Sequence, residues 1–399
     1  SDDNFDSVSD QTVSVTTTDD DVAGFTIAVT DGSTSVAESG NTDTFTVVLD
    51  AEPDSDVVLT ISSADTGEAT VTSSLTFTSA NWDTPQTVTV TGVDDDLIDG
   101  TITSTITVSV NDGSSDNNFD GVSDQTVSVT TTDDDVAGFT IAETNGSTSV
   151  AESGNTDTFT IVLDAEPDSD VVLSISSSDT GEATVTSSLT FTSGNWDTPQ
   201  TVTVTGADDD LIDGTQTTTV TIAVNDGSSD NDFDGVSDQT VSVTTTDDDA
   251  AGFTIAETNG STSVAESGTT DTFTVVLNAQ PDSDVVIQFV SADTGEATIT
   301  SLLTFTSGNW DTPQTVTVTG VDENFVDLDQ TTEITASVLE VSSDDNFDSV
   351  SDQTVSVTTT DDDAAGFTIA ETDGSTSVAE SGTTDTFTVV LDAQPSSDV

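Results

Sequence analysis

The side chains that could do chemistry in this chain of 399 residues are almost all carboxylates. Asp and Glu number 77, whereas Lys, Arg, His, Cys and Tyr are absent, which gives a formal charge of −77. Without those residues the chain cannot form a thiolate or imidazole metal site, a histidine base, a lysine Schiff base or a basic surface for nucleic acid. The remaining chemistry is that of carboxylate oxygens, which are hard ligands for cations.

The carboxylates are gathered in short clusters, and the clusters recur at a fixed interval. Runs of three Asp residues begin at Asp19, Asp133, Asp247 and Asp361, a constant spacing of 114 residues. A constant period without insertions is typical of tandem domains, and a unit of this length suits one β-sandwich. The predicted domains are residues 22–135, 136–249 and 250–363, with residues 1–21 as the last strand of a preceding repeat and residues 364–399 as the first strands of a following one.

The pattern of apolar residues predicts that the chain folds despite its charge. High net charge with low hydrophobicity is typical of disorder, but 32% of the residues are hydrophobic and most alternate with Thr or Ser, as they do in strands. The predicted fold is all-β, a tandem array of Ig-like antiparallel β-sandwiches with about seven strands each. In the first complete domain we expect strands near residues 24–28 with 33–36, 42–50, 56–63, 69–78, 86–93, 103–110 and 125–132.

Strand direction then predicts where the acids meet. Because antiparallel strands reverse at every turn, alternate loops lie at the same end of the sandwich. In the first complete domain, one end therefore carries Glu38, residues 64–68, residues 94–100 and the triplet that begins at Asp133. Carboxylates this close repel one another unless a cation joins them, and an oxygen-only ligand set favours Ca²⁺ over Mg²⁺. The alternative is a solvated acidic rim that is screened by salt.

The order of these motifs resembles that of the Calx-β domain. The residues concerned are 36–40 (VAESG), 43–49 (DTFTVVL), 88–90 (VTV) leading into Asp94, and 127–129 (VSV) leading into Asp133. The chain is also similar to the calcium-dependent repeat arrays of bacterial surface adhesins. The resemblance covers essentially all of each unit. It implies calcium ligands from the glutamate after the first strand, from the loop at residues 94–100 and from the terminal acidic cluster.

Carried onto this sequence, the resemblance implies one set of calcium ligands in each complete domain. The sets are Glu38, Asp94, Asp95, Asp99, Asp133, Asp134 and Asp135; Glu152, Asp208, Asp209, Asp213, Asp247, Asp248 and Asp249; and Glu266, Asp322, Glu323, Asp327, Asp361, Asp362 and Asp363. In the third domain, the loop at residues 322–327 keeps an acid at three of the four expected ligand positions. Its site is therefore expected to survive with altered affinity for calcium. The sequence departs from the Calx-β pattern at residues 64–68, where Calx-β domains carry an Asp-Tyr pair and this chain has Asp65 and Glu68. We therefore expect no ligand from that loop.

A second candidate calcium loop lies at the opposite end of the domain. Residues 230–235 (DNDFDG) match the start of a D-x-D-x-D-G calcium loop, and residues 116–121 are a near copy. The candidate ligands are Asp116, Asn118, Asp120, Asp230, Asp232 and Asp234. The alternative is a solvated loop in which Phe119 or Phe233 plugs the core.

The acidic end of each domain should face the opposite end of the next one, with almost no linker between them. Asp168, Asp170 and Asp226 are expected on the facing end of the second domain. A calcium ion at this junction would fix the angle between domains. The alternative is an ion site within one domain and a flexible hinge.

Together these features favour a structural rod outside the cell, as a segment of a giant bacterial surface adhesin or filament. The expected cofactor is Ca²⁺, and the expected partners are neighbouring repeats, further copies of the chain and O-linked glycans on exposed Thr and Ser. The propensity of Thr for strands explains those hydroxyls equally well. No apolar run approaches the ~20 residues that span a bilayer, so no membrane span is expected.

An adhesive module that binds glycans or a surface is the alternative function, with Trp82 as a stacking platform instead of a core plug. Carboxylate pairs can hydrolyse glycosides, but an ion cage explains crowded acids at a junction better, so we expect no enzyme. Asn145 and Asn259 begin N-glycosylation motifs, yet the equivalent residues elsewhere are Asp31 and Asp373. A tight turn explains all four copies.

Overall fold

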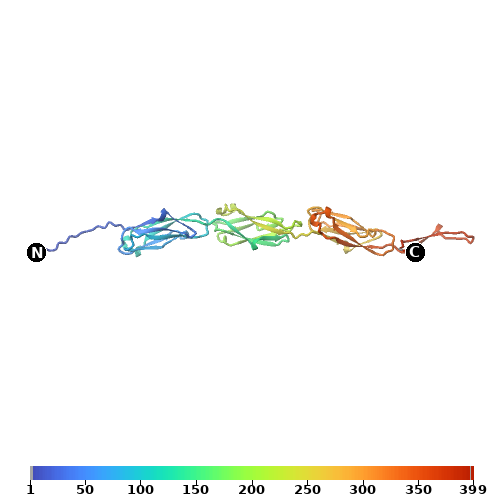
Figure 1. Ribbon diagram of the computed structural model, residues 1–399, viewed down its shortest axis with the longest axis horizontal. Helices are drawn as coiled ribbons and strands as arrows, with labels where there is room; N and C mark the ends of the chain where they lie inside the picture. Colours follow the sequence, from blue (N-terminus) through green and yellow to red (C-terminus); the bar gives the residue numbers. More distant parts are fainter. Residues whose placement is uncertain (1–2, 396) are drawn as a thin grey trace.

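The computed structural model describes residues 3–395 and 397–399, and it forms an extended row of three β-sandwiches (Figure 1). In the first sandwich a four-stranded sheet of order β1-β3-β7-β5 lies against a five-stranded sheet of order β2-β9-β8-β4-β6. The second and third sandwiches repeat this order. Neighbouring strands are antiparallel except β2 and β9, which pair in parallel. The predicted all-β tandem fold is confirmed.

The element bounds repeat from one sandwich to the next. The first contains β1 (Phe25–Val29), β2 (Thr34–Ala37), β3 (Thr42–Leu49), β4 (Val57–Ser63), β5 (Ala69–Val71), β6 (Ser74–Phe77), β7 (Gln86–Gly92), β8 (Ile102–Val110) and β9 (Gln125–Thr132). The second contains β10 (Phe139–Glu143), β11 (Thr148–Ala151), β12 (Thr156–Leu163), β13 (Val171–Ser177), β14 (Ala183–Val185), β15 (Ser188–Phe191), β16 (Gln200–Gly206), β17 (Gln216–Val224) and β18 (Gln239–Thr246). The third contains β19 (Phe253–Glu257), β20 (Thr262–Ala265), β21 (Thr270–Leu277), β22 (Val285–Ser291), β23 (Ala297–Ile299), β24 (Leu302–Phe305), β25 (Gln314–Gly320), β26 (Gln330–Val338) and β27 (Gln353–Thr360).

The helices of the described residues are all short 3-10 turns. They are η1 (Asp3–Phe5), η2 (Thr30–Gly32), η3 (Asp112–Ser114), η4 (Asn117–Phe119), η5 (Thr144–Gly146), η6 (Asp226–Ser228), η7 (Asn231–Phe233), η8 (Thr258–Gly260), η9 (Glu340–Ser342), η10 (Asp345–Phe347) and η11 (Thr372–Gly374). In the described part of the chain, no helix has the length and apolar character needed to cross a membrane.

The core of each sandwich comes from the alternation of side chains along its strands. In β3, Phe45, Val47 and Leu49 are buried between the sheets, while the intervening residues face outward. Ile106 and Val108 of β8 meet them from the other sheet. Since the strand residues that point outward are mainly Thr and Ser, most carboxylates are left to the loops and the ends, and few, such as Asp43 and Glu333, lie within strands. The sheets therefore form without bringing like charges together on their faces.

The segment at residues 69–78 differs from the single strand that was predicted. β5 pairs with β7 in one sheet, and β6 pairs with β4 in the other. The chain changes sheets at Thr72 and Ser73, where the Thr72 amide donates to the Thr89 carbonyl and the Ser73 carbonyl accepts from the Ile61 amide. Alternation alone hides this switch, because both halves keep the same period. The first strand of each domain divides in the same way at a turn, so nine strands stand where about seven were expected.

The two ends of the chain carry partial copies of the repeat. Residues 11–18 repeat the sequence of β9 but are not in a strand in this structure. At the other end, β28 (Phe367–Glu371) and β29 (Phe387–Leu391) form a two-stranded sheet of their own. The predicted terminal segments also include residues 1, 2 and 396, which lie outside the described residues.

The three tryptophans serve as plugs at the edge of the core. Trp82, Trp196 and Trp310 are partly buried and pack against the core of their own sandwich. The Trp82 carbonyl also accepts a hydrogen bond from the Leu49 amide, at 3.1 Å. The core interpretation of Trp82 is therefore confirmed, and its ring is not laid out as an exposed platform.

One residue of the third sandwich carries backbone strain that its counterparts avoid. Gly100 and Gly214 have φ of 73° and 72° at the end of the loop before β8 and β17, and the third copy has Leu328 at φ 74°. All three amides donate to an Asp oxygen, with Leu328 donating to Asp361 at 2.9 Å. The hydrogen bond holds the turn in place, although a left-handed conformation costs a residue with a side chain roughly 1–2 kcal/mol.

Leu328→Gly should therefore stabilise the third sandwich by about 1 kcal/mol, and Gly214→Leu should destabilise the second by a similar amount. Leu328 is exposed, so the substitution removes strain and little packing. Urea denaturation of the full chain can follow one sandwich at a time by keeping a single tryptophan and changing the other two to Phe. A lower midpoint for Leu328→Gly would show that the Leu328 side chain makes contacts that outweigh its strain.

Candidate metal centre

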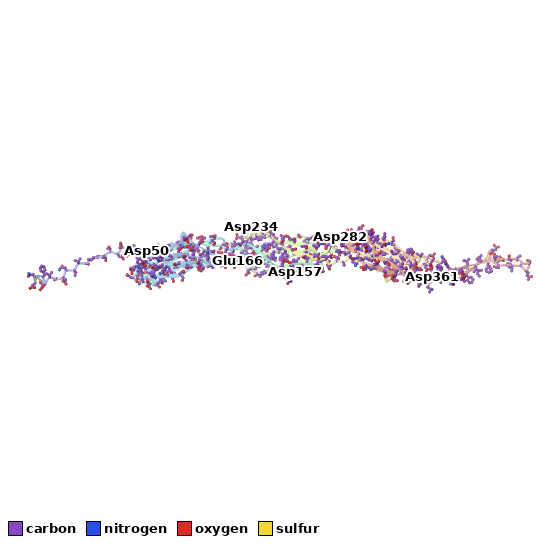
Figure 2. All side chains as sticks on the ribbon, in the orientation of Figure 1. Asp50, Asp157, Glu166, Asp234, Asp282 and Asp361 are labelled. Carbon is purple, nitrogen blue, oxygen red and sulfur yellow. The ribbon has the colours of Figure 1, made fainter. Side chains whose placement is uncertain are left out.

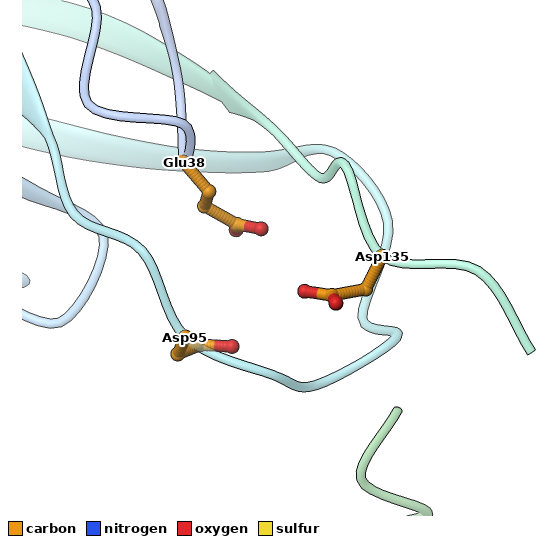
Figure 3. Close-up of side chains that lie close together, drawn as sticks. All are labelled: Glu38, Asp95 and Asp135. Carbon is orange, nitrogen blue, oxygen red and sulfur yellow. The ribbon is translucent and has the colours of Figure 1, made fainter. Parts of the chain in front are cut away.

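Acids from four separate segments meet at one end of the first sandwich. Glu38 follows β2, Asp95 and Asp99 lie in the loop between β7 and β8, and Asp135 follows β9. Single carboxylate oxygens of Glu38, Asp95 and Asp135 lie within 4.8 Å of one another, and their side chains point towards a common centre (Figure 3). A second group, formed by Glu38, Glu68 and Asp99, meets the same distance limit. Glu38 belongs to both groups and so lies between them.

The same end of the other two sandwiches carries equivalent groups. In the second they are Glu152 with Asp247 and Asp249, and Glu152 with Glu182 and Asp213. In the third they include Glu266 with Glu323 and Asp327. The convergence that strand direction predicted is therefore present in all three sandwiches. The acids also converge in the third sandwich, where the sequence of the loop differs, because Glu323 and Asp327 occupy the positions of Asp95 and Asp99.

The shared glutamate of each site is buried without any hydrogen-bond partner. Glu38 and Glu152 are 1% exposed and Glu266 is 0% exposed. Both carboxylate oxygens of all three have no hydrogen-bond partner. An ionised carboxylate in such a position is costly unless a positive charge compensates it, and this chain has no cationic side chain. The protein itself therefore leaves the charge of these residues unbalanced.

The proton affinity of the buried glutamates reflects this imbalance. Burial, followed by the charges of Asp133, Asp95 and Asp99, raises the pKa of Glu38 to about 7. Burial and neighbouring aspartates raise the pKa of Glu152 to about 7 in the same way. Burial and the charge of Asp361 raise the pKa of Glu266 to about 7, although the Asp362 backbone acts in the opposite direction. Each site must therefore take up either protons or another cation near neutral pH, because burial and repulsion both disfavour the charged form.

The other predicted residues have different places in the site. Asp133 is an anchor: its two oxygens accept from the amides of Gly100 at 2.9 Å and Asp135 at 2.7 Å. The Leu97 amide likewise donates to Asp95, at 2.9 Å. The middle residue of each triplet and the first acid of each loop are exposed to solvent at the rim of the site. These rim residues are Asp94, Asp134, Asp208, Asp248, Asp322 and Asp362.

The outer members of the second and third triplets follow the same plan. Asp247 accepts from the amides of Gly214 and Asp249, and Asp361 accepts from those of Leu328 and Asp363. Burial and the charge of Asp247 raise the pKa of Asp249 to about 6. The side chain of Asp209 accepts from the Leu211 amide, as Asp95 does in the first sandwich. Backbone amides of the loops before β17 and β26 therefore tie these loops to the Asp triplets.

Glu68 is the residue that the sequence interpretation missed. No ligand was expected from residues 64–68, but Glu68 is only 6% exposed and lies with Glu38 and Asp99. The Val93 amide donates to the Glu68 carbonyl at 2.9 Å, so Glu68 is fixed directly beside the acidic loop. The available signal was its recurrence as Glu182 and Glu296, each directly before the strand that begins with a buried Ala.

Gly92, at the end of β7, lets these segments meet. A Cβ at this position would lie 1.9 Å from the carbonyl oxygen of Ala37, the residue directly before Glu38. The same contact recurs at Gly206, with 1.9 Å, and at Gly320, with 2.1 Å. Only glycine allows the backbones of the two sheets to approach so closely. The strand that leads to Asp95 and the strand that leads to Glu38 therefore converge just before their acidic residues.

The second candidate calcium loop, at the opposite end, has a structural explanation. The Asp116 carboxylate accepts from the amides of Asn118 at 2.9 Å and Ser55 at 2.8 Å, and these bonds lower its pKa. Phe119 is buried in the core, as the alternative interpretation predicted. Asp230 and Phe233 repeat the arrangement in the second sandwich. The exposed residues Asn118, Asp120, Asp232 and Asp234 surround a turn that is already held by main-chain amides.

The acidic end of the first sandwich faces the second sandwich. The Asp96 carbonyl accepts a hydrogen bond from the Glu166 amide at 2.7 Å, and Figure 2 labels Glu166 at this junction. Burial and the charges of Asp95, Asp133 and then Asp168 raise the pKa of Asp99. Asp168 belongs to the second sandwich, so the predicted approach of the two ends is confirmed.

The comparisons with known proteins add a set of distant structural neighbours. No protein-family model matches the chain, and no curated protein matches it. The crystal structure of CBD12 from CALX1.2 matches with 14% identity and a TM-score of 0.22, over 50% of this chain and 79% of that one. The titin I-band fragment I67–I69 matches with 10% identity and a TM-score of 0.26, over 86% and 97%. Domains 4 and 5 of the S-layer protein SbsC match with 19% identity and a TM-score of 0.25, over 57% and 99%.

By its strand order the chain is a tandem array of β-sandwiches, each made of a four-stranded and a five-stranded sheet. Each sandwich adds a buried carboxylate cluster at the end from which the chain passes to the next one.

In metal-free buffer the free energy of unfolding should fall as the pH rises from about 5 to about 8. The pKa of Glu38, Glu152 and Glu266 is about 7 in the folded chain and 4.5 for an ordinary glutamate. Between these values the folded state keeps protons that the unfolded state has released, so raising the pH favours unfolding. Urea denaturation at constant ionic strength measures this slope. A stability that increases over the same pH range would contradict the buried position of these residues.

Gly206→Ala should destabilise the second sandwich by about 3 kcal/mol, because the added methyl group overlaps backbone that cannot rotate away. Gly235→Ala is the matched control, since nothing lies within 4 Å of a Cβ at that position. Denaturation of the full chain with Trp196 as the only tryptophan reports on this sandwich. Equal midpoints for the two variants would mean that the approach of Gly206 to Ala151 is not a tight constraint.

Proposed function

We propose that the acidic end of each sandwich binds Ca²⁺ and that the array is a structural rod stiffened by these ions. The observation that supports the proposal is the pair of unpartnered, buried oxygens on Glu38, Glu152 and Glu266, each beside further carboxylates. A buried anion without a donor requires a cation. In a chain without Lys, Arg or His, that cation has to come from solution.

The ligand chemistry favours calcium among the available cations. All candidate ligands are oxygens, with no nitrogen or sulfur donor, which suits Ca²⁺ or Mg²⁺ better than Zn²⁺ or Cu²⁺. Carboxylates from four separate segments can supply the larger, irregular shell of 6–8 oxygens that Ca²⁺ accepts. In the first sandwich Glu38, Asp95, Asp99, Asp135 and Glu68 would hold the ion or ions, with Asp133 fixing the loop. Bound Ca²⁺ would supply charge compensation and cross-link the ends of both sheets.

The repeated architecture supports a structural role over a catalytic or adhesive one. The three sandwiches carry the same site at the same place, whereas a binding surface usually differs among repeats. The tryptophans, which could have stacked on sugars, pack into the cores. We therefore assign the chain to an extracellular surface adhesin or filament of a bacterium, in which the repeats act as spacers.

Glu152→Gln tests the ion site directly, because it removes the charge and keeps the shape. Without metal the variant should be more stable than the parent chain, since a buried charge is gone. With saturating Ca²⁺ the parent should gain on the order of 10 °C in Tm, and the variant should lose this gain in its second sandwich. Calorimetric titration should also show fewer bound ions. The full chain with Trp196 as the only tryptophan measures both stabilities.

Glu143→Gln is the matched control for this experiment, because Glu143 is an exposed glutamate of the same sandwich. It should change neither the metal-free stability nor the calcium response appreciably. A parent chain that melts at the same temperature in Ca²⁺ and in excess chelator would contradict the proposed function. A response to Mg²⁺ equal to that to Ca²⁺ would contradict the choice of ion.

A further inference from the structure

The loop between β7 and β8 has two sides with different partners. One side carries Asp95 and Asp99, which belong to the acidic groups of the first sandwich. The residues between them face the second sandwich: Leu97 forms a parallel bridge with Glu166, next to the hydrogen bond from the Glu166 amide to the Asp96 carbonyl. Of these five consecutive residues, the first and last belong to the acidic groups and the three between them contact the next sandwich.

The contact with the next sandwich is also apolar. Ile98 packs against the core of the second sandwich, together with Ala137 of the short linker. An open cleft of about 330 Å³ lies beside this contact and is lined by Ile98 and Asp135 of the first unit and by Asp232 and Val236 of the second. Asp135 belongs to the acidic group with Glu38 and Asp95. The ion site and the junction therefore share a wall.

The second junction repeats the backbone contacts of the first. The Gln280 amide donates to the Asp210 carbonyl at 2.7 Å, and Leu211 forms the parallel bridge with Gln280. Ile212 packs against the core of the third sandwich, and its carbonyl accepts from the Asn346 side chain at 3.2 Å. The contact recurs with Gln280 in place of Glu166, so it does not require a carboxylate at that position.

From this geometry we infer that the β7–β8 loop is a latch that couples cation binding in one sandwich to docking of the next, with Ile98 and Ile212 as the coupling residues. The inference rests on the proposed function of the acidic site. Anchoring of Gly100 and Asp95 leaves the loop little freedom to move one side without the other. Asp168 of the second sandwich adds negative charge near Asp99, so docking in the absence of a cation is opposed by repulsion.

The sign of the coupling follows from these two effects. A bound cation removes the repulsion and fixes Asp95 and Asp99, which presents Ile98 and the Asp96 carbonyl to the second sandwich. Since coupling between two binding events is reciprocal, docking must raise the affinity for the cation by the same factor. The stiffness of each junction is therefore controlled by residues that do not touch the ion.

Ile98→Ala tests this coupling because it leaves every acidic residue intact. The full chain with Glu152→Gln and Glu266→Gln isolates the first site, and calorimetric titration with Ca²⁺ measures its affinity. The affinity should fall about 5-fold or more in Ile98→Ala, the lower range of typical coupling between sites. The matched control is Ile141→Ala, which removes another partly buried isoleucine from the same core but lies outside the latch. It should leave the affinity unchanged.

A distance measurement tests the reciprocal effect. The chain has no cysteine, so spin labels at Ser62→Cys and Ser176→Cys, on exposed residues of β4 and β13, report on the first junction alone. The distance distribution should be narrow in Ca²⁺ and broad without it, and Ile98→Ala should broaden it in Ca²⁺. Equal calcium affinity in Ile98→Ala and the parent would overturn the coupling while leaving the ion site intact. No calcium binding in the isolated-site background would overturn the proposed function itself, and the coupling with it.

Discussion

The structure depends on where a chain with 77 acidic residues and no basic ones can place its negative charge. Repulsion among carboxylates opposes compaction throughout. The strands meet this constraint by exposing Thr and Ser on their outer faces, so the sheets pair without charge between neighbours. The acids are displaced into loops, and antiparallel strand order gathers those loops at the two ends of each sandwich. The fold thereby concentrates repulsion at a few places, where one cation can relieve it.

The buried carboxylates at the two ends of a sandwich have different surroundings. At the end with η4, Asp116 takes hydrogen bonds from main-chain amides and its pKa is lowered. At the other end, Glu38 has no donor and its pKa is raised. The difference lies in the backbone: a tight turn directs free amides at Asp116, whereas Glu38 leaves a strand whose amides are already paired. Motif spacing alone made both ends candidates for a metal site.

The junction makes the acidic end more than a local feature. Asp96, Leu97 and Ile98 reach the second sandwich from the same loop that supplies Asp95 and Asp99. A domain that ended in a solvated acidic rim would repel the next one, which also presents acids such as Asp168 at its facing end. Placing an apolar latch between charged residues allows contact where charge alone would prevent it. Figure 1 shows the three sandwiches following one another in a single row.

By itself the sequence determined the all-β class, the period of 114 residues and the end of the sandwich at which the acids converge. These features follow from side-chain alternation, exact repetition and the reversal of antiparallel strands. They can be predicted without knowing how far apart any two residues lie in space. Only the tertiary structure decided that residues 69–78 divide between two sheets, that the Glu68 side chain lies with those of Glu38 and Asp99, and that Asp116 is satisfied by amides. Those outcomes depend on which backbone groups face a given side chain across the sandwich. Packing between residues far apart in the chain determines which groups face each other, and the local sequence does not contain this information.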